Sequence, residues 1–255
     1  MTNAGPAIGW GLAVALSLVL GAVAAAKLRL SGRVAAGLTA FGGGLLLAAV
    51  ALELVPDADA EAGPALTAAG LAAGTLIYVG ADAWLGRNES RRKMRRAMQA
   101  GASGRPAPDD MASAESARGL SIAAGLFIDG VPESLALGLT IAEQELGIAL
   151  LVGILVGNLV ESYGAAGPII AGGHSAGFAL RLMTAIGLSL ALATALGATV
   201  LADASPELIG TAQAVAAGAV LAVITIAIIP HAFQEVSRLV AAVTVAGFAC
   251  GYLLS

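Results

Sequence analysis

The stretch 208–230 reads LIGTAQAVAAGAVLAVITIAIIP and contains no charged residue. A helix of that length rises about 34 Å at 1.5 Å per residue, enough to cross a hydrocarbon core about 30 Å thick. Similar apolar runs recur along all 255 residues, of which 58% are hydrophobic and only 12% are charged. The runs do not alternate as the strands of a membrane β-barrel do. We therefore expect an all-α integral membrane protein.

The apolar runs predict eight transmembrane helices in a single domain, with boundaries good to a few residues. The spans are 6–26, 34–55, 65–86, 118–142, 146–171, 177–202, 208–230 and 237–254. One connection, 87–117, is long, polar and basic. We expect a largely irregular loop there, opening with a short helix over 91–98.

The 13 Lys and Arg residues orient the predicted helices. With eight spans, all the Lys and Arg residues fall in or beside the connections on one side of the membrane. The charged residues on the other side are all acidic. The positive-inside rule then places the 87–117 loop in the cytoplasm and both termini outside. We expect a multi-pass protein of the cytoplasmic membrane in contact with lipid. The net charge of −4 and the lack of a nucleic-acid motif predict no binding to nucleic acid.

Two predicted spans end in a similar pattern. Span 2 ends in 53–61, ELVPDADAE, and span 7 ends in 227–235, AIIPHAFQE. Both have an aliphatic pair, Pro, a polar residue, Ala, and an acid four residues after that polar residue. Because the two spans end on opposite sides, the match predicts an inverted repeat of spans 1–3 against spans 6–8, a recurrent transporter architecture. Chance placement of two prolines at helix ends is the alternative.

Spans 4 and 5 carry polar residues where a bilayer centre is expected. Asp129 and Glu133 are four residues apart, and Asn158 and Glu161 are three apart, so each pair shares a helix face. Pro132 removes a backbone N–H and frees a carbonyl beside the two acids. A charge at the bilayer centre costs roughly 2.5–3.5 kcal/mol on insertion scales. These residues are therefore the candidate functional site.

No basic residue is predicted at that depth to neutralise the three carboxylates. They are therefore either protonated, as in a proton relay, or they bind a cation. The alternative is neutral acids that only hold helices together through hydroxyls such as Ser134, Ser162 and Tyr163. Oxygen ligands suit Mg²⁺, Mn²⁺ or Fe²⁺, whereas zinc favours His and Cys.

Three further residues are weaker candidates for contact with a cation. Glu53 lies one turn before Pro56, where an entrance from outside would be. His231 and Glu235 are four residues apart near the cytoplasmic end of span 7, where they would form a release site or simply a solvated helix end.

At these residues the chain resembles the ZIP family of divalent-metal transporters. Asp129-Gly130-Val131-Pro132-Glu133-Ser134 matches His-Asn-x-Pro-Glu-Gly in the family's span 4, and Asn158-Leu159-Val160-Glu161 looks like its span 5 metal motif. Leu54-Val55-Pro56-Asp57 and Ile228-Ile229-Pro230-His231 resemble the ends of its spans 2 and 7. The resemblance implies a 3+2+3 arrangement of eight helices.

The resemblance also implies a function, and this chain departs from it at several positions. Asp129 replaces a His, and Ile226-Ala227 replaces a His-Glu pair, so nitrogen ligands are depleted. We expect transport of a divalent metal ion (zinc, manganese or iron) as substrate through a site between spans 4 and 5. The alternative is a ZIP-like protein that does not transport and serves in sensing, assembly or partner binding. We expect no enzyme activity and no organic cofactor, and the Gly-rich helices would permit a homodimer.

Overall fold

The computed structural model describes residues 4–28, 31–103, 110–142, 148–200 and 204–255. Some side chains inside these ranges, including those of residues 85–103 and of Asp129, lie outside the described part. All elements in the described ranges are helices. They are α1 (Ala4–Lys27), α2 (Gly32–Ala49), η1 (Val50–Leu54), α3 (Val55–Ser103), α4 (Asp110–Ala142), α5 (Ile148–Ala171), α6 (Ala176–Val200), α7 (Pro206–Val223), η2 (Ile224–Ile228), α8 (Ile229–Val236) and α9 (Leu239–Leu254).

Within the described ranges, six helical stretches are long and apolar enough to cross a membrane. They are Gly5–Lys27, Gly32–Trp84, Ile122–Ile141, Ile148–Ala171, Ala176–Val200 and Pro206–Val236. A shorter apolar helix, Leu239–Leu254, follows them. By length and composition the chain is a multi-pass membrane protein, which confirms the predicted all-helical membrane class.

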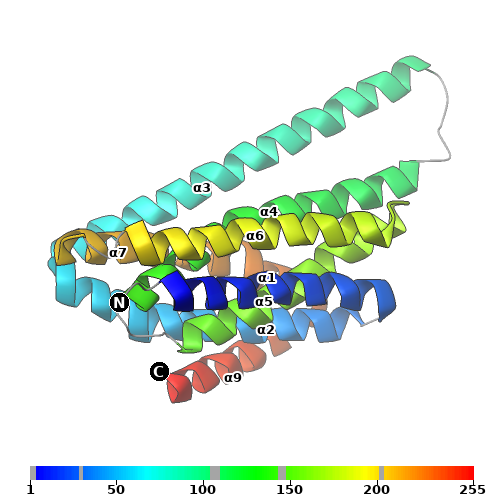
Figure 1. Cartoon of the computed structure of the whole chain (residues 1–255). Coiled ribbons are helices and arrows are strands. Elements are labelled where there is room, and N and C mark those ends of the chain that lie inside the picture. Colours follow the sequence, from blue (N-terminus) through cyan, green and yellow to red (C-terminus); the bar gives the residue numbers. More distant parts are fainter. Residues whose placement is uncertain (1–3, 29–30, 104–109, 143–147, 201–203) are drawn as a thin grey trace.

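The Gly32–Trp84 stretch is interrupted at Gly63. This residue has φ 77° and ψ 165°, and Pro64 follows it. Glycine adopts a positive φ without a steric penalty, and proline cannot donate the next helical hydrogen bond. The chain reverses direction at this end of the bundle (Figure 1).

The prediction of an irregular loop over 87–117 is wrong for most of that segment. Helix α3 continues to Ser103, and α4 begins at Asp110, so only 104–109 lie outside the described helices. The run 91–100, RRKMRRAMQA, consists of residues with high helix propensity and contains no Gly or Pro. As a result α3 extends past the rest of the bundle (Figure 1).

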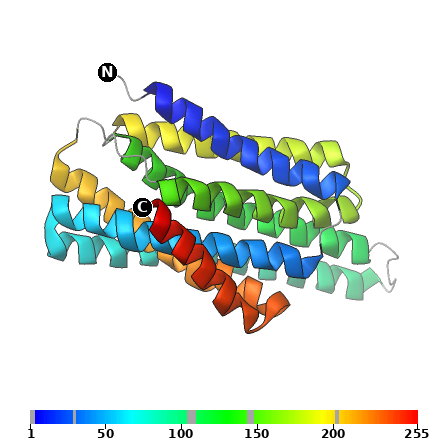
Figure 2. The same ribbon diagram turned by 90° about the horizontal axis from the view of Figure 1, so that it is seen from below.

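Glycines bring the helices close together in pairs. Helix α1 packs on α6, α2 on α9, and α3 on α7. A Cβ at Gly44 would overlap the carbonyl oxygen of Thr244, and a Cβ at Gly218 would overlap that of Leu71. Small residues at such crossings allow the backbones of membrane helices to touch. Figure 2 shows α9 lying across α2 as a result of this contact.

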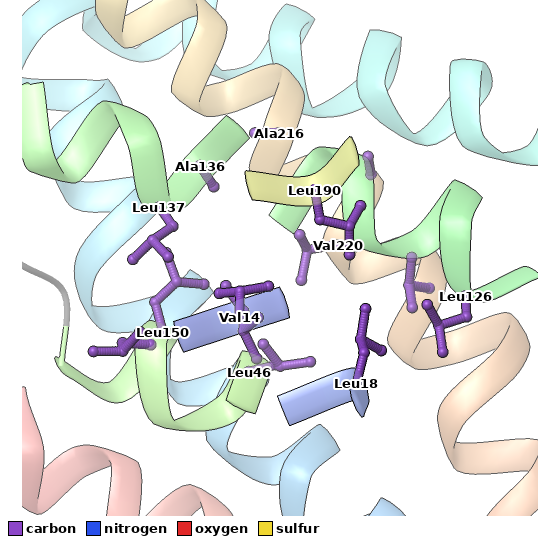
Figure 3. Close-up of a cluster of buried hydrophobic side chains, with 14 of the residues drawn as sticks. Val14, Leu18, Leu46, Leu126, Ala136, Leu137, Leu150, Leu190, Ala216 and Val220 are labelled. Atoms are coloured by element: carbon purple, nitrogen blue, oxygen red, sulfur yellow. The ribbon is translucent and has the colours of Figure 1, made fainter. Parts of the chain in front are cut away.

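Helices α4 and α5 lie between these pairs. Helix α5 contacts α1, α2 and α4, and α4 contacts α5, α6 and α7. Aliphatic side chains from six helices fill the space around them (Figure 3). The labelled members are Val14, Leu18, Leu46, Leu126, Ala136, Leu137, Leu150, Leu190, Ala216 and Val220. The two central helices, which carry the candidate residues, are therefore packed by protein on several sides.

The succession of backbone elements in 31–63 recurs in 205–237, with every element in the same order and of the same length. Ser31 caps α2 and Ser205 caps α7, and each helix runs for 18 residues before a five-residue π-helix, η1 or η2. In η1 the N–H of Val55 donates to the carbonyl of Val50, and in η2 that of Ile229 donates to Ile224. The two stretches are called the matching stretches below.

A proline follows each π-helix two residues later, and each matching stretch ends at a positive φ. The prolines are Pro56 and Pro230, and the positive φ angles are 77° at Gly63 and 52° at Ser237. The proline ring would clash with the carbonyl four residues earlier in a regular α-helix. An extra residue in the turn, which makes it a π-helix, relieves that clash.

Candidate functional site

The candidate site is built on the contact between α4 and α5. Gly119 of α4 lies against Ala165 and Ile169 of α5, and Gly172 lies against Ser116. The two helices therefore run in opposite directions, with α5 beginning where α4 ends (Figure 1). This register fixes the depth of every polar residue on them.

Asn158 and Glu161 both lie on the side of α5 that faces α4. They precede Ala165 by seven and four residues, which are helical spacings for one face. Asn158 is 2% exposed, and its Nδ2 atom has no hydrogen-bond partner. Glu161 is half-buried. The predicted shared face therefore points to the neighbouring helix that carries the other candidates.

Glu133 is buried in α4, with 5% of its surface exposed. Gly119 of α4 lies at the level of Ala165 and Ile169 of α5, and the two helices are antiparallel. Moving from Gly119 to Glu133 along α4 therefore corresponds to moving the same number of residues back along α5. Glu133 therefore lies at the depth of 151–155 on α5. Asn158 and Glu161 are one to two turns further along the bundle than Glu133. The carboxylates of Glu133 and Glu161 therefore lie at different depths along the helix axes.

Asp129 belongs to α4, but its side chain lies outside the described residues. Its backbone is at the depth of Asn158, and Pro132, which lacks an N–H, leaves the carbonyl of Ile128 without its usual helical donor. Among the side chains that are described, no three His, Cys, Asp or Glu residues come close enough to hold a metal ion. The predicted part of Asp129 in the site stays a prediction.

Two of the hydroxyls that could stabilise neutral acids bond to backbone carbonyls. Ser162 donates to the carbonyl of Leu18 in α1 at 2.5 Å, and Tyr163 donates to the carbonyl of Leu28, directly after α1, at 3.4 Å. The Oγ of Ser134 is buried without a hydrogen-bond partner. Ser162 and Tyr163 therefore attach α5 to α1 and the residue that follows it.

Glu53 lies in η1, next to the start of α5. Its carboxylate interacts with the backbone amides of Ala149 and Leu150, in the first turn of that helix. The Oε2 atom is buried and has no hydrogen-bond partner. The first amides of a helix have no intrahelical acceptor and carry a partial positive charge, so they attract a carboxylate. Glu53 is thus closer to the end of the bundle than Glu133.

Glu235 lies at the start of another helix. Its side chain is exposed. Gly32 is the first residue of α2, and a Cβ on Gly32 would lie 3.0 Å from the Oε2 of Glu235. The matching acid, Glu61, lies beside Gly210 in the first turns of α7. The Oε2 of Glu61 is buried without a hydrogen-bond partner. A carboxylate beside the first residue of a helix, as at Glu235, is in a position to stabilise the helix start. His231, one turn before Glu235 in α8, is exposed.

The sequence reasoning did not single out Gln213. Its side chain is 0% exposed in α7, and its Oε1 lacks a hydrogen-bond partner. An amide within the uncharged run 208–230 is a signal that could have identified it. Thr140, 2% exposed near the end of α4, is a second buried polar residue that was missed.

The described site offers oxygen atoms from Glu133, Asn158 and Glu161 inside an apolar bundle. Such groups can bind a hard cation or exchange protons. His174, outside this region, is exposed and stacks on Phe178 with ring centroids 4.5 Å apart. No family model matches the chain, and no curated protein matches its sequence.

Proposed function

We propose that the protein transports a divalent metal cation across the cytoplasmic membrane through the region between α4 and α5. The observation that carries the proposal is the burial of Glu133 and Asn158 on the two central helices, with Glu161 on the same face of α5. Buried ionisable groups in membrane helices are expensive and usually mark an ion pathway. No Lys or Arg occurs in α5, and none occurs in α4 after Arg118.

The helix arrangement supports the proposal. Counting Gly32–Trp84 as two spans, divided at Gly63, and Leu239–Leu254 as one gives eight crossings. The matching stretches 31–63 and 205–237 run in opposite directions in Figure 1, with α4 and α5 between them. These observations support an inverted repeat in the 3+2+3 arrangement, an architecture in which transporters bind substrates near the membrane midplane. The basic residues then lie in the cytoplasm and both termini outside.

The ligand atoms favour a hard or borderline ion as substrate. The described candidates supply carboxylate and amide oxygen, and His231 and His174 lie outside the α4–α5 region. Mn²⁺ and Fe²⁺ accept such a set, whereas Zn²⁺ prefers nitrogen and sulfur. We therefore propose Mn²⁺ or Fe²⁺ ahead of Zn²⁺, in a scaffold that resembles the ZIP family.

The proposal is tested by ion uptake into proteoliposomes that contain the full-length protein. Glu133→Gln and Glu161→Gln keep the side-chain volume and remove the charge. We expect each to lower the initial Mn²⁺ uptake rate about tenfold or more, since truncating one member of a buried charged contact costs about 2–5 kcal/mol. Asp82→Asn, at an exposed carboxylate of α3, is the matched control and should leave the rate unchanged.

Two results would contradict the proposal. One is uptake by the Glu133→Gln/Glu161→Gln double variant at the rate of the unaltered protein. The other is the absence of flux and of bound Mn²⁺, Fe²⁺ or Zn²⁺ in the unaltered protein, which would favour a ZIP-like protein with a sensing, assembly or partner-binding role.

A further inference from the structure

Glu53 interacts with a helix that is distant from it in the sequence. Its carboxylate faces the amides of Ala149 and Leu150, where α5 begins, and this interaction is called the Glu53 contact below. Helix α5 carries Asn158 and Glu161, and it also packs on α2, since Gly42 lies against Gly157 and a Cβ on Gly153 would meet Leu46. The Glu53 contact therefore acts on the helix that bears the candidate site.

The second half of the molecule contains an internal control for this acid. The residue equivalent to Glu53 in the second matching stretch is Ala227. It is the fourth residue of η2, as Glu53 is of η1, and both π-helices have five residues. The π-helix therefore forms without an acid. By contrast, the equivalent positions 61 and 235 are acids in both halves, with Glu61 beside Gly210 of α7 and Glu235 beside Gly32 of α2. The fold does not require the charge of Glu53, so the charge serves a role that only one half performs.

The Glu53 contact is also incomplete as a structural interaction. The Oε2 atom is buried without a hydrogen-bond partner, and Asp57, one turn later, repels the carboxylate. A π-helix within a longer helix is often found at functional sites, and loss of its extra residue would re-aim the side chains within it. Helix amides offer about half a positive charge. A divalent cation therefore attracts the carboxylate more strongly than they do.

We propose that Glu53 is a positioning residue that keeps the first turn of α5 closed against η1, and that an arriving divalent cation releases this contact and gains access to the site. The inference rests on the proposed transport function. Position 227 is alanine, so the second matching stretch has no acid at the equivalent place, and the proposed control of access applies to the end of the bundle near Glu53.

The test measures the accessibility of Ala149 to water. Cys250 is the chain's single cysteine, so Cys250→Ser provides a background without thiols. Ala149 is 0% exposed, and a cysteine at this position should react slowly with a membrane-impermeant maleimide. Adding Glu53→Ala should raise the labelling rate about fivefold to tenfold, the effect expected from one charge at a partly buried helix start. Glu53→Asp should restore slow labelling more than Glu53→Ala does.

Controls separate this effect from misfolding and from the opposite half. Ile148→Cys, at a side chain that the protein leaves 47% exposed, should react at the same rate with and without Glu53. Ala227→Glu should leave labelling at 149 unchanged. Addition of Mn²⁺ to the protein with Glu53 intact should raise labelling at 149, and this rise should vanish in Glu53→Ala.

The outcomes distinguish the positioning role from transport itself. Equal labelling of 149 with Glu53 and with Glu53→Ala, in variants that elute as folded protein, would overturn the positioning role even if Mn²⁺ uptake is observed. No response to Mn²⁺ would also overturn it. Conversely, a response at 149 with no uptake by the unaltered protein would support the positioning role and contradict the proposed transport.

Discussion

The stretches 31–63 and 205–237 have the same succession of backbone elements and differ in their side chains. Both contain a serine cap, an 18-residue α-helix, a five-residue π-helix and a final positive φ. The shared residues include Pro56 and Pro230, which shape the backbone. Among the residues that differ, Glu53 and Asp57 correspond to Ala227 and His231.

This comparison distinguishes acids that both halves share from an acid found in one half. Glu61 and Glu235 occupy equivalent positions, Glu61 beside Gly210 of α7 and Glu235 beside Gly32 of α2. The π-helix that contains Glu53 has an equivalent in the second stretch, but the residue equivalent to Glu53 is not an acid. An acid in one half alone is therefore a better functional candidate than an acid found in both, and variants made in matched pairs can test this distinction.

The largest effect is expected at Gly44 and Gly218, which occupy equivalent positions in the two matching stretches. A Cβ at either position would overlap a backbone carbonyl, that of Thr244 or of Leu71. Gly44→Ala and Gly218→Ala should each lower the free energy of unfolding by upward of about 2 kcal/mol, because two helix backbones must separate. Unfolding in detergent measures this.

Gly37 in α2 is the matched control for this pair. No atom lies within 4 Å of the place that its Cβ would occupy. Gly37→Ala should be neutral or stabilise the helix by up to about 1 kcal/mol. If Gly44→Ala and Gly218→Ala differed by more than the error of the measurement, the two halves would not pack equivalently.

A smaller and unequal effect is expected at the two prolines. Pro56→Ala and Pro230→Ala each restore a backbone N–H and remove the clash that favours the π-helix. Only the first change re-aims an acid, Glu53. In the Ala149→Cys background, Pro56→Ala should raise maleimide labelling severalfold, whereas Pro230→Ala should leave it within about twofold. Equal responses would show that the π-helices act alike, whatever side chain they carry.

Much of the fold follows from the sequence because local patterns determine it. The uncharged run 208–230 predicts a membrane helix, and the prolines at 56 and 230 predict the related helix ends. The π-helices were not predicted, since a π-turn differs from an α-turn by one residue and leaves the apolar pattern intact. The long α3 was missed because the polarity of 87–103 was given more weight than its helix propensity.

The site was predictable only where it depends on one helix. The common face of Asn158 and Glu161 follows from their spacing, and the structure directs that face to α4. The proximity of Glu53 to Ala149 joins residues that are far apart in the chain, and no local pattern encodes it. The relation of Glu235 to Gly32 is equally nonlocal, so the sequence alone offers a release site and a solvated helix end as alternatives there.

The smallest effect is expected at the serine caps. The Oγ of Ser31 accepts from the N–H of Val34 at 3.3 Å, and that of Ser205 accepts from Leu208 at 3.4 Å. Both bonds are long, so Ser31→Ala and Ser205→Ala should each lower the free energy of unfolding by about 0.5 kcal/mol, the low end for helix caps.

The cap of α6 calibrates this last comparison. Ser175 accepts from the N–H of Phe178 at 3.1 Å and has no part in the repeated pattern. Ser175→Ala should therefore lower the free energy of unfolding more than either Ser31→Ala or Ser205→Ala, toward about 1 kcal/mol. Because Ser31 and Ser205 lie at opposite ends of the bundle, equal values for them would show that the two halves match in energy as well as in geometry. If the effects of Ser31→Ala and Ser205→Ala differed from each other as much as they differ from the effect of Ser175→Ala, the two halves would match only in the shape of the backbone.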